Sequence, residues 1–155
     1  MEDPTAMSDD ALEAAVKALA AEERTLAARL LALLARFEVR GLPPAAGFAD
    51  LYDYCRRELG WAEGQAYERV WCARAGLEHP AVLERLGDGR LTPAALLALR
   101  PVLTPESWEE VLKEAEGMGR REAEDLAAEL DPRADLPDEL GPDDAAGAAA
   151  AARDG

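Results

Sequence analysis

The sequence contains little cysteine and little histidine. Its 155 residues include two cysteines, Cys55 and Cys72, and a single histidine, His79. A structural zinc ion is held by about four cysteine or histidine ligands, and the chain has no Cys-x-x-Cys pair and no Cys/His cluster. The composition therefore excludes a zinc site of this kind, and we predict no metal and no cofactor. Both cysteines lie in apolar periodic segments, which predicts buried free thiols.

Long apolar runs are also missing. No run approaches the roughly 18 residues that a membrane-spanning helix requires. The N-terminal residues are acidic, whereas a secretory signal would begin with basic residues. We therefore expect a cytoplasmic protein that makes no membrane contact.

Basic residues are few relative to acidic ones. The chain has 17 lysines and arginines against 32 aspartates and glutamates, which gives a net charge of −15. Residues 1–10 are polar and acidic, and residues 131–155 are rich in Pro, Gly, Ala and Asp. Such segments cannot bury enough apolar surface to offset the entropy of ordering them. We predict two disordered ends and one folded domain over residues 11–130.

No segment shows the alternation of a β-strand, so we predict an all-α fold of about six helices. The longest helix is expected over residues 9–40, with N-cap choices at Ser8, Asp9 and Asp10 and a stop at Gly41. Its apolar residues recur at the spacing of a coiled-coil heptad. They are Leu12, Val16, Leu19, Leu26, Leu30, Leu33 and Phe37. This seam is a candidate dimer interface, and the alternative is that it packs on the helices of its own chain.

Prolines, glycines and N-cap residues divide the rest of the chain into shorter helices. Gly60 and Gly76 are expected to end two of them, and Thr92-Pro93 and Thr104-Pro105 to begin two more. The predicted spans are residues 48–59, 63–75, a short helix opening at Pro80, 93–99, 105–116 and 120–130.

The segments around Gly60 have the form of a helix-turn-helix. Two helices joined by a short glycine turn are typical of this motif, and residues 48–100 would form its core. The second helix would then enter the major groove by its first residues. Gln65 is a candidate contact to adenine, whose edge its side chain matches, and Arg69 is a candidate contact to guanine or to phosphate. The candidate phosphate contacts are Arg56, Arg57 and Arg74.

Residues 48–130 carry a resemblance to known proteins. The runs LYDYCRRELGWAEGQAYERV, HPAVLERLGDGRLT and LTPESWEEVL resemble the helical N-terminal region of bacterial HNH-endonuclease-type proteins. Residues 48–126 are more loosely similar to the helix-turn-helix domain of ParB-type partition proteins. Both resemblances imply a DNA-associated module. Neither implies catalysis, because an HNH site needs a metal-binding and a base histidine on a ββα unit, and this chain has His79 alone.

The sequence thus leads to two main functional hypotheses, and neither is an enzyme; a third is an inhibitor of a DNA-binding protein that would use the acidic face at residues 105–129. The first is a non-catalytic, regulatory DNA-binding module of helix-turn-helix type, with double-stranded DNA as its partner and no small-molecule substrate. The second is a protein interaction or dimerisation module, accessory to a nuclease or DNA-binding partner, that makes no DNA contact itself. Two departures favour the second: Arg56 occupies a position that is usually small in this motif, and Ala62 replaces the usual serine N-cap, at a cost of about 1 kcal/mol.

Overall fold

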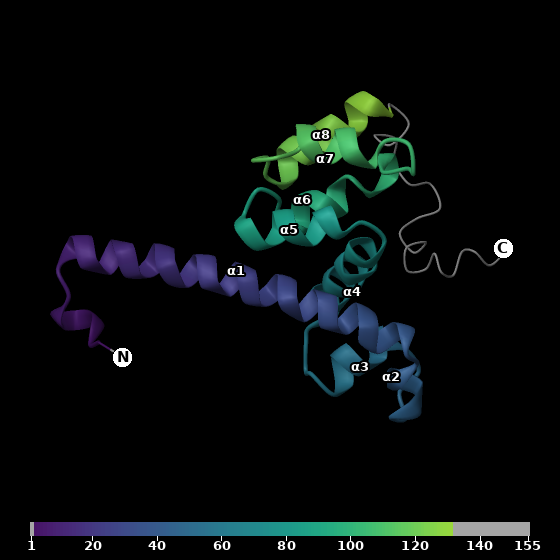
Figure 1. Cartoon of the computed structure of the whole chain (residues 1–155), viewed down its shortest axis with the longest axis horizontal. Helices are drawn as coiled ribbons and strands as arrows, with labels where there is room; N and C mark the ends of the chain where they lie inside the picture. Colours follow the sequence, from purple (N-terminus) through teal and green to yellow (C-terminus); the bar gives the residue numbers. More distant parts are fainter. Residues whose placement is uncertain (1, 132–155) are drawn as a thin grey trace.

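The fold is entirely helical in the computed structural model, which describes residues 2–131 (Figure 1). The described chain forms eight α-helices and two 3-10 helices, and no strand, so the predicted all-α class is confirmed. The elements are η1 Pro4–Ala6, α1 Asp9–Val39, α2 Leu42–Ala45, α3 Leu51–Arg57, α4 Glu63–Glu78, α5 Pro80–Asp88, α6 Pro93–Ala98, η2 Arg100–Val102, α7 Trp108–Glu114 and α8 Arg120–Leu130. The tail predicted over residues 131–155 lies, except for Asp131, outside the described residues.

Helix α1 begins and ends close to its predicted limits. The Ser8 side chain accepts a hydrogen bond from the Ala11 amide at 3.2 Å, and two aspartates occupy the first turn. The helix ends where Gly41 adopts the left-handed conformation, with φ of 70°. The N-terminal residues that precede this helix were predicted to be disordered over residues 1–10. In the structure Asp3 caps the short helix η1 there, and α1 already starts at Asp9.

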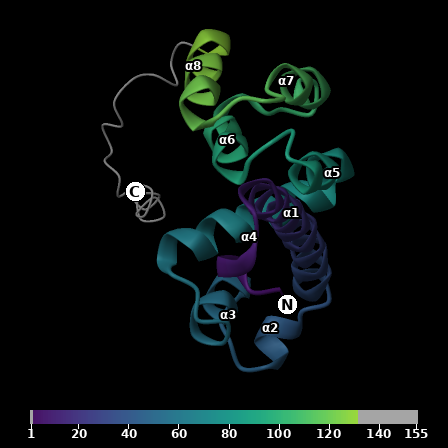
Figure 2. The same cartoon turned by 90° about the vertical axis from the view of Figure 1, so that its left-hand side faces the viewer.

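Only the second half of α1 packs on the rest of the molecule. The buried residues of this helix are Leu31, Leu34 and Ala35, and α4 and α5, with the short helix α2, are packed against it. The first half extends away from the other α-helices in Figure 1. Figure 2, viewed from the N-terminal end of α1, shows the right-hand flank of this helix open.

Helix α4 lies at the centre of the molecule. It contacts α1, α3, α5 and α6, and its buried residues are mostly small, including Ala66, Cys72 and Ala73, each with no exposed surface. Small side chains let the surrounding helices approach closely. Tight packing around α4 therefore organises the core.

The predicted end of α4 at residue 75 is wrong, and Gly76 shows why. The helix continues through Gly76 to Glu78 and stops at His79, immediately before Pro80. A Cβ atom added at Gly76 would lie 2.6 Å from the Leu83 side chain of α5. This glycine serves the close approach of two helices and does not terminate one.

Two further helices are shorter than their spacing predicts. Helix α3 begins at Leu51, not at residue 48, because the Asp50 carboxylate accepts from the Asp53 amide at 2.8 Å and caps it there. Helix α7 begins at Trp108, not at residue 105. Ser107 Oγ accepts from the Thr104 amide at 2.8 Å, which holds the preceding residues in a turn.

Helices α6, α7 and α8 form a second layer beside the layer of α1, α4 and α5. Helix α8 packs on α6 and η2, and α6 packs on α4. Two contacts join α7 and its following turn to α5: the His79 ring stacks on Trp108 at 3.8 Å, and Arg85 pairs with Glu116 at 2.9 Å. The core therefore runs from the second half of α1 through α4 to α8.

Candidate functional site

The predicted helix-turn-helix corresponds to α3, the turn of residues 58–62, and α4. Gly60 takes φ of 73° in this turn, and the Trp61 amide donates to the Cys55 carbonyl at 3.0 Å. Ala62 is the N-cap of α4 and makes no side-chain capping bond. The two helices thus have the expected order and connection.

Two of the predicted phosphate contacts are held in ion pairs. Arg57 binds Asp53 through two hydrogen bonds of 2.8 and 3.0 Å and lies over the Phe48 ring. Arg74 binds Glu38 of α1, with Nε 3.0 Å from a carboxylate oxygen. The Arg57 guanidinium lowers the pKa of the Asp53 carboxyl to about 2. Contact with phosphate would require each arginine to leave its carboxylate.

The other three predicted contacts are Arg56 and Arg69, which contact Trp61, and Gln65, which lies beside Arg69. Arg56 donates to the Trp61 carbonyl oxygen at 3.1 Å, and the Arg69 guanidinium lies 4.6 Å from the centre of the Trp61 ring. Gln65 is one turn before Arg69, and its amide oxygen can accept from both terminal nitrogens of that arginine at 3.2 and 3.3 Å. The structure therefore brings Gln65 and Arg69 together, whereas Arg57 and Arg74 bind different carboxylates.

The fold leaves most of the seam of α1 uncovered. Five of its seven side chains are exposed, with exposed fractions from 40% at Leu12 to 67% at Leu33. The two others, Leu30 and Phe37, are partly buried. The Phe37 ring packs on the Tyr54 ring, with 4.8 Å between the two ring centres. The exposed members are Leu12, Val16, Leu19, Leu26 and Leu33.

Helical geometry explains how α1 can pack and still keep this seam open. Successive residues are turned by about 100° around the helix axis. The buried residues Leu31, Leu34 and Ala35 therefore centre on a face about 100° from the seam. Sequence analysis missed this second face. Its signal was the spacing of three and four residues among these same positions, which the stronger heptad pattern obscured.

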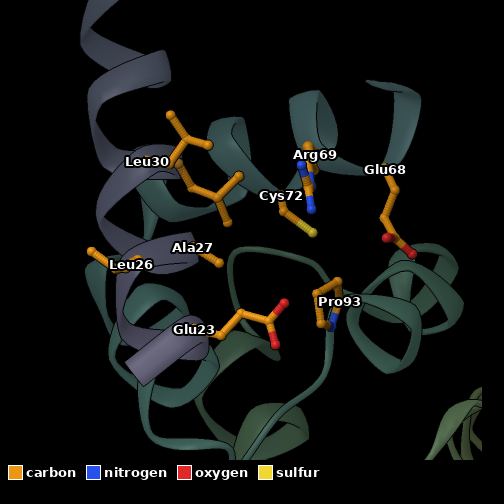
Figure 3. A pocket seen from close by; sticks show the side chains of 9 residues that line it. Glu23, Leu26, Ala27, Leu30, Glu68, Arg69, Cys72 and Pro93 are labelled. Atoms are coloured by element: carbon orange, nitrogen blue, oxygen red, sulfur yellow. The ribbon is translucent and has the colours of Figure 1, made fainter. Parts of the chain in front are cut away.

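A groove of about 300 Å³ runs along the boundary between the seam and α4 (Figure 3). Leu26 and Leu30 line it from α1, and Cys72 lines it from α4. Glu23 and Arg69 point into it from opposite walls. The groove is thus apolar at its base, with charged groups of both signs at its sides.

The two thiols are buried in the core. Burial raises the pKa of Cys55 to about 11 and that of Cys72 to about 12. A thiol reacts as its thiolate, so both cysteines stay protonated and unreactive near neutral pH. Both are free, as the sequence predicted.

A metal-binding cluster and a membrane-spanning helix are both absent from the described residues. Within residues 2–131, no group of three or more His, Cys, Asp or Glu side chains is arranged to hold a metal ion. None of the described helices is long and apolar enough to cross a membrane.

Comparison with protein-family models, with curated proteins and with solved structures finds no match to this chain. Nothing in these comparisons links it to HNH-endonuclease-type or ParB-type proteins, and that resemblance stays a prediction.

Proposed function

We propose that this chain is a helical protein-interaction module and that the seam of α1 is its binding surface. The observation that carries the proposal is the exposure of Leu12, Val16, Leu19, Leu26 and Leu33 along one side of a 31-residue helix. Continuous apolar surface of this kind marks interaction sites in folded proteins. An amphipathic helix of the partner, lying along the seam, would cover it.

The first half of α1 gives this proposal further support. Among the described residues it has no buried side chain. An isolated helix of about 15 residues is marginally stable in water, and contact with a second helix would stabilise it. A protruding half-helix with one apolar side is therefore suited to association.

In-cell cross-linking tests the proposed surface directly. A photo-reactive amino acid is placed at Leu19, on the seam, in the cells that naturally produce the protein. Ala21 is the matched control, because it is also exposed and lies on the opposite side of α1. We expect a discrete cross-linked species from position 19 and none from position 21.

The result identifies the partner class by mass. A product of twice the chain mass means self-association, and any other discrete product means a different protein partner. Equal or absent cross-linking at the two positions would reject the seam as a binding surface.

A second candidate function is DNA binding through α3 and α4. The observation that favours it is the connection of these helices by a Gly60 turn, with Gln65 and Arg69 adjacent near the exposed start of α4. The test is fluorescence anisotropy of a labelled 30-base-pair duplex (about three helical turns) across a salt series. DNA binding predicts a steep salt dependence and a loss of affinity in Gln65→Ala and Arg69→Ala. Unchanged affinity in both variants would reject this site.

The two candidates share a proposed cytoplasmic location, and neither includes a catalytic step. Glu63 and Glu68 flank the predicted DNA-reading residues on α4 and would repel phosphate. The seam carries a single carboxylate, Glu23, among seven apolar residues, and for this reason we rank the interaction module first.

A further inference from the structure

We infer that the occupant of the α1 seam is a second copy of this chain, with the two α1 helices antiparallel. This inference rests on the proposed function, since it names the partner of the same surface. Three features of the chain support it: the order of the seam residues, the charges that flank them and the groove beside α4.

The seam matches itself when one copy is reversed. In an antiparallel pair, each a position faces a d position of the other helix. Leu12 then meets Phe37 of the second copy, and Leu19 meets Leu30. Because Leu12 to Phe37 spans 25 residue steps at 1.5 Å each, this contact extends over about 38 Å. The protruding half of each helix thereby covers the second half of the other.

The charges along α1 complement each other in the same orientation. Residues 9–23 carry five acids and one lysine, whereas residues 24–39 carry three arginines and one glutamate. That glutamate, Glu38, already binds Arg74 of its own chain. Reversal of one helix therefore places the acidic half of each copy beside the basic half of the other, and a parallel arrangement would place like beside like.

The residues bordering the seam make this argument specific. Glu22 and Arg29 both occupy g positions, which face each other across an antiparallel pair. Both side chains are exposed, and neither takes part in an ion pair within residues 2–131. By symmetry the pair Glu22–Arg29 would form twice. In a parallel dimer these two g positions would instead face Ala27 and Leu34, with which no ion pair is possible.

The groove beside α4 can accommodate the second helix. At this register, the small residues Ala20 and Ala27 face each other on the groove side of the seam. Glu23 of the second copy would lie beside Leu26, within the groove that Arg69 lines together with Glu23 and Glu68 of the first copy. Arg69 is the cation in this groove, and it offsets part of the desolvation of the seam carboxylates.

Disulfide cross-linking of the full chain tests the orientation. The variants Leu19→Cys and Leu30→Cys are mixed and oxidised, and we expect a mixed dimer. Leu19→Cys alone should not cross-link to itself, because the two copies of position 19 would be separated by 11 residue steps, or about 16 Å, beyond disulfide reach. The native thiols are fully buried and do not interfere.

Charge reversal tests the flanking pairs in sedimentation equilibrium. Glu22→Arg should weaken dimer formation roughly tenfold, because two attractive pairs become repulsive. The double variant Glu22→Arg/Arg29→Glu should restore it to about the parent value. Glu129→Arg on the exposed face of α8 makes the same change in net charge far from α1 and is the control.

The outcomes separate this inference from the proposed function. Self-cross-linking of Leu19→Cys without the mixed product would show a parallel dimer, which overturns the orientation and leaves the interaction module standing. A chain that stays monomeric at about 100 µM would overturn self-association. The proposed function would then survive only if in-cell cross-linking at position 19 gave a product with a different protein.

Discussion

Gly76 lies inside α4 at a point where no side chain fits. An added Cβ would lie 2.6 Å from Leu83, so Leu83 and α5 would have to move. We predict that Gly76→Ala lowers the free energy of unfolding by about 1–2 kcal/mol, since overpacking outweighs the better helix propensity of alanine. Urea denaturation measures the change.

The control for that variant is Gly64→Ala in the first turn of the same helix. A Cβ there meets nothing within 4 Å, so we expect no loss of stability and a gain of up to about 1 kcal/mol. Equal effects at the two glycines would show that helix propensity, and not the contact with α5, governs Gly76.

Glu23 is the one polar residue in the apolar heptad pattern of α1. A buried polar group at such a position specifies register at a cost in stability. If the seam binds a second copy, Glu23→Leu should tighten dimer formation by roughly tenfold or more. Sedimentation equilibrium checks this, with Ala21→Leu on the opposite side of α1 as the control for added apolar surface. An unchanged or weaker dimer would place Glu23 outside the interface.

At the scale of the element, α3 depends on a carboxylate near its start. Asp53 accepts from the Ala49 amide at 2.8 Å and from Arg57, and its pKa falls from 3.8 to about 2. A pKa lowered by folding stabilises the folded state above the unfolded value, and this stabilisation is lost as the pH falls through the folded value. The contribution is therefore present above about pH 4 and disappears toward pH 2.

We accordingly predict that Asp53→Asn lowers Tm at pH 6, and that its difference from the parent chain narrows steadily between pH 4 and about pH 2. Thermal unfolding followed by circular dichroism measures both proteins at each pH. A difference that stays constant across this range would mean that the carboxylate charge is not the source of the stabilisation.

Helix α1 illustrates how one element can serve two surfaces. Its second half buries Leu31, Leu34 and Ala35 against α4 and α5, while the seam about 100° away stays open. The folding of the core and the binding at the five exposed seam positions therefore depend on different residues, whereas Leu30 and Phe37 belong to the seam and also pack against the core. Substitutions on the seam should change association with little effect on the monomer.

At the scale of the whole molecule, association through α1 would couple stability to concentration. A binding event that occurs only in the folded state raises Tm as the partner concentration rises. We predict an increase of about 3–5 °C in Tm over a hundredfold increase in chain concentration. Scanning calorimetry of the full chain measures it.

The seam variant Leu19→Asp/Leu33→Asp is the comparison for this experiment. Both positions are exposed in the monomer, so its Tm should match that of the dilute parent chain and should not vary with concentration. A parent chain with an equally constant Tm would argue against a folded dimer.

Most helix limits could be predicted because their causes are local. Thr92 caps α6 by accepting from the Ala95 amide at 3.1 Å, and Pro93 follows it, as the sequence indicated. The limits that were wrong depend on distant contacts or on competing turns. At Gly76 the close contact with Leu83 of α5 requires a glycine inside the helix. At Thr104 the hydrogen bond from its amide to Ser107 Oγ holds a turn, so that α7 begins later than predicted.

The features of the candidate site also divide into those that the sequence predicts and those that depend on tertiary contacts. The heptad pattern of α1, the helix-turn-helix order and the net charge of −15 follow from the sequence alone, because periodicity and composition need no knowledge of tertiary contacts. Only the tertiary structure decided that the seam stays exposed and that Arg74 binds Glu38, 36 residues away. Such outcomes depend on which faces of distant helices meet, and the packing of α1 on α4 and α5 determines that.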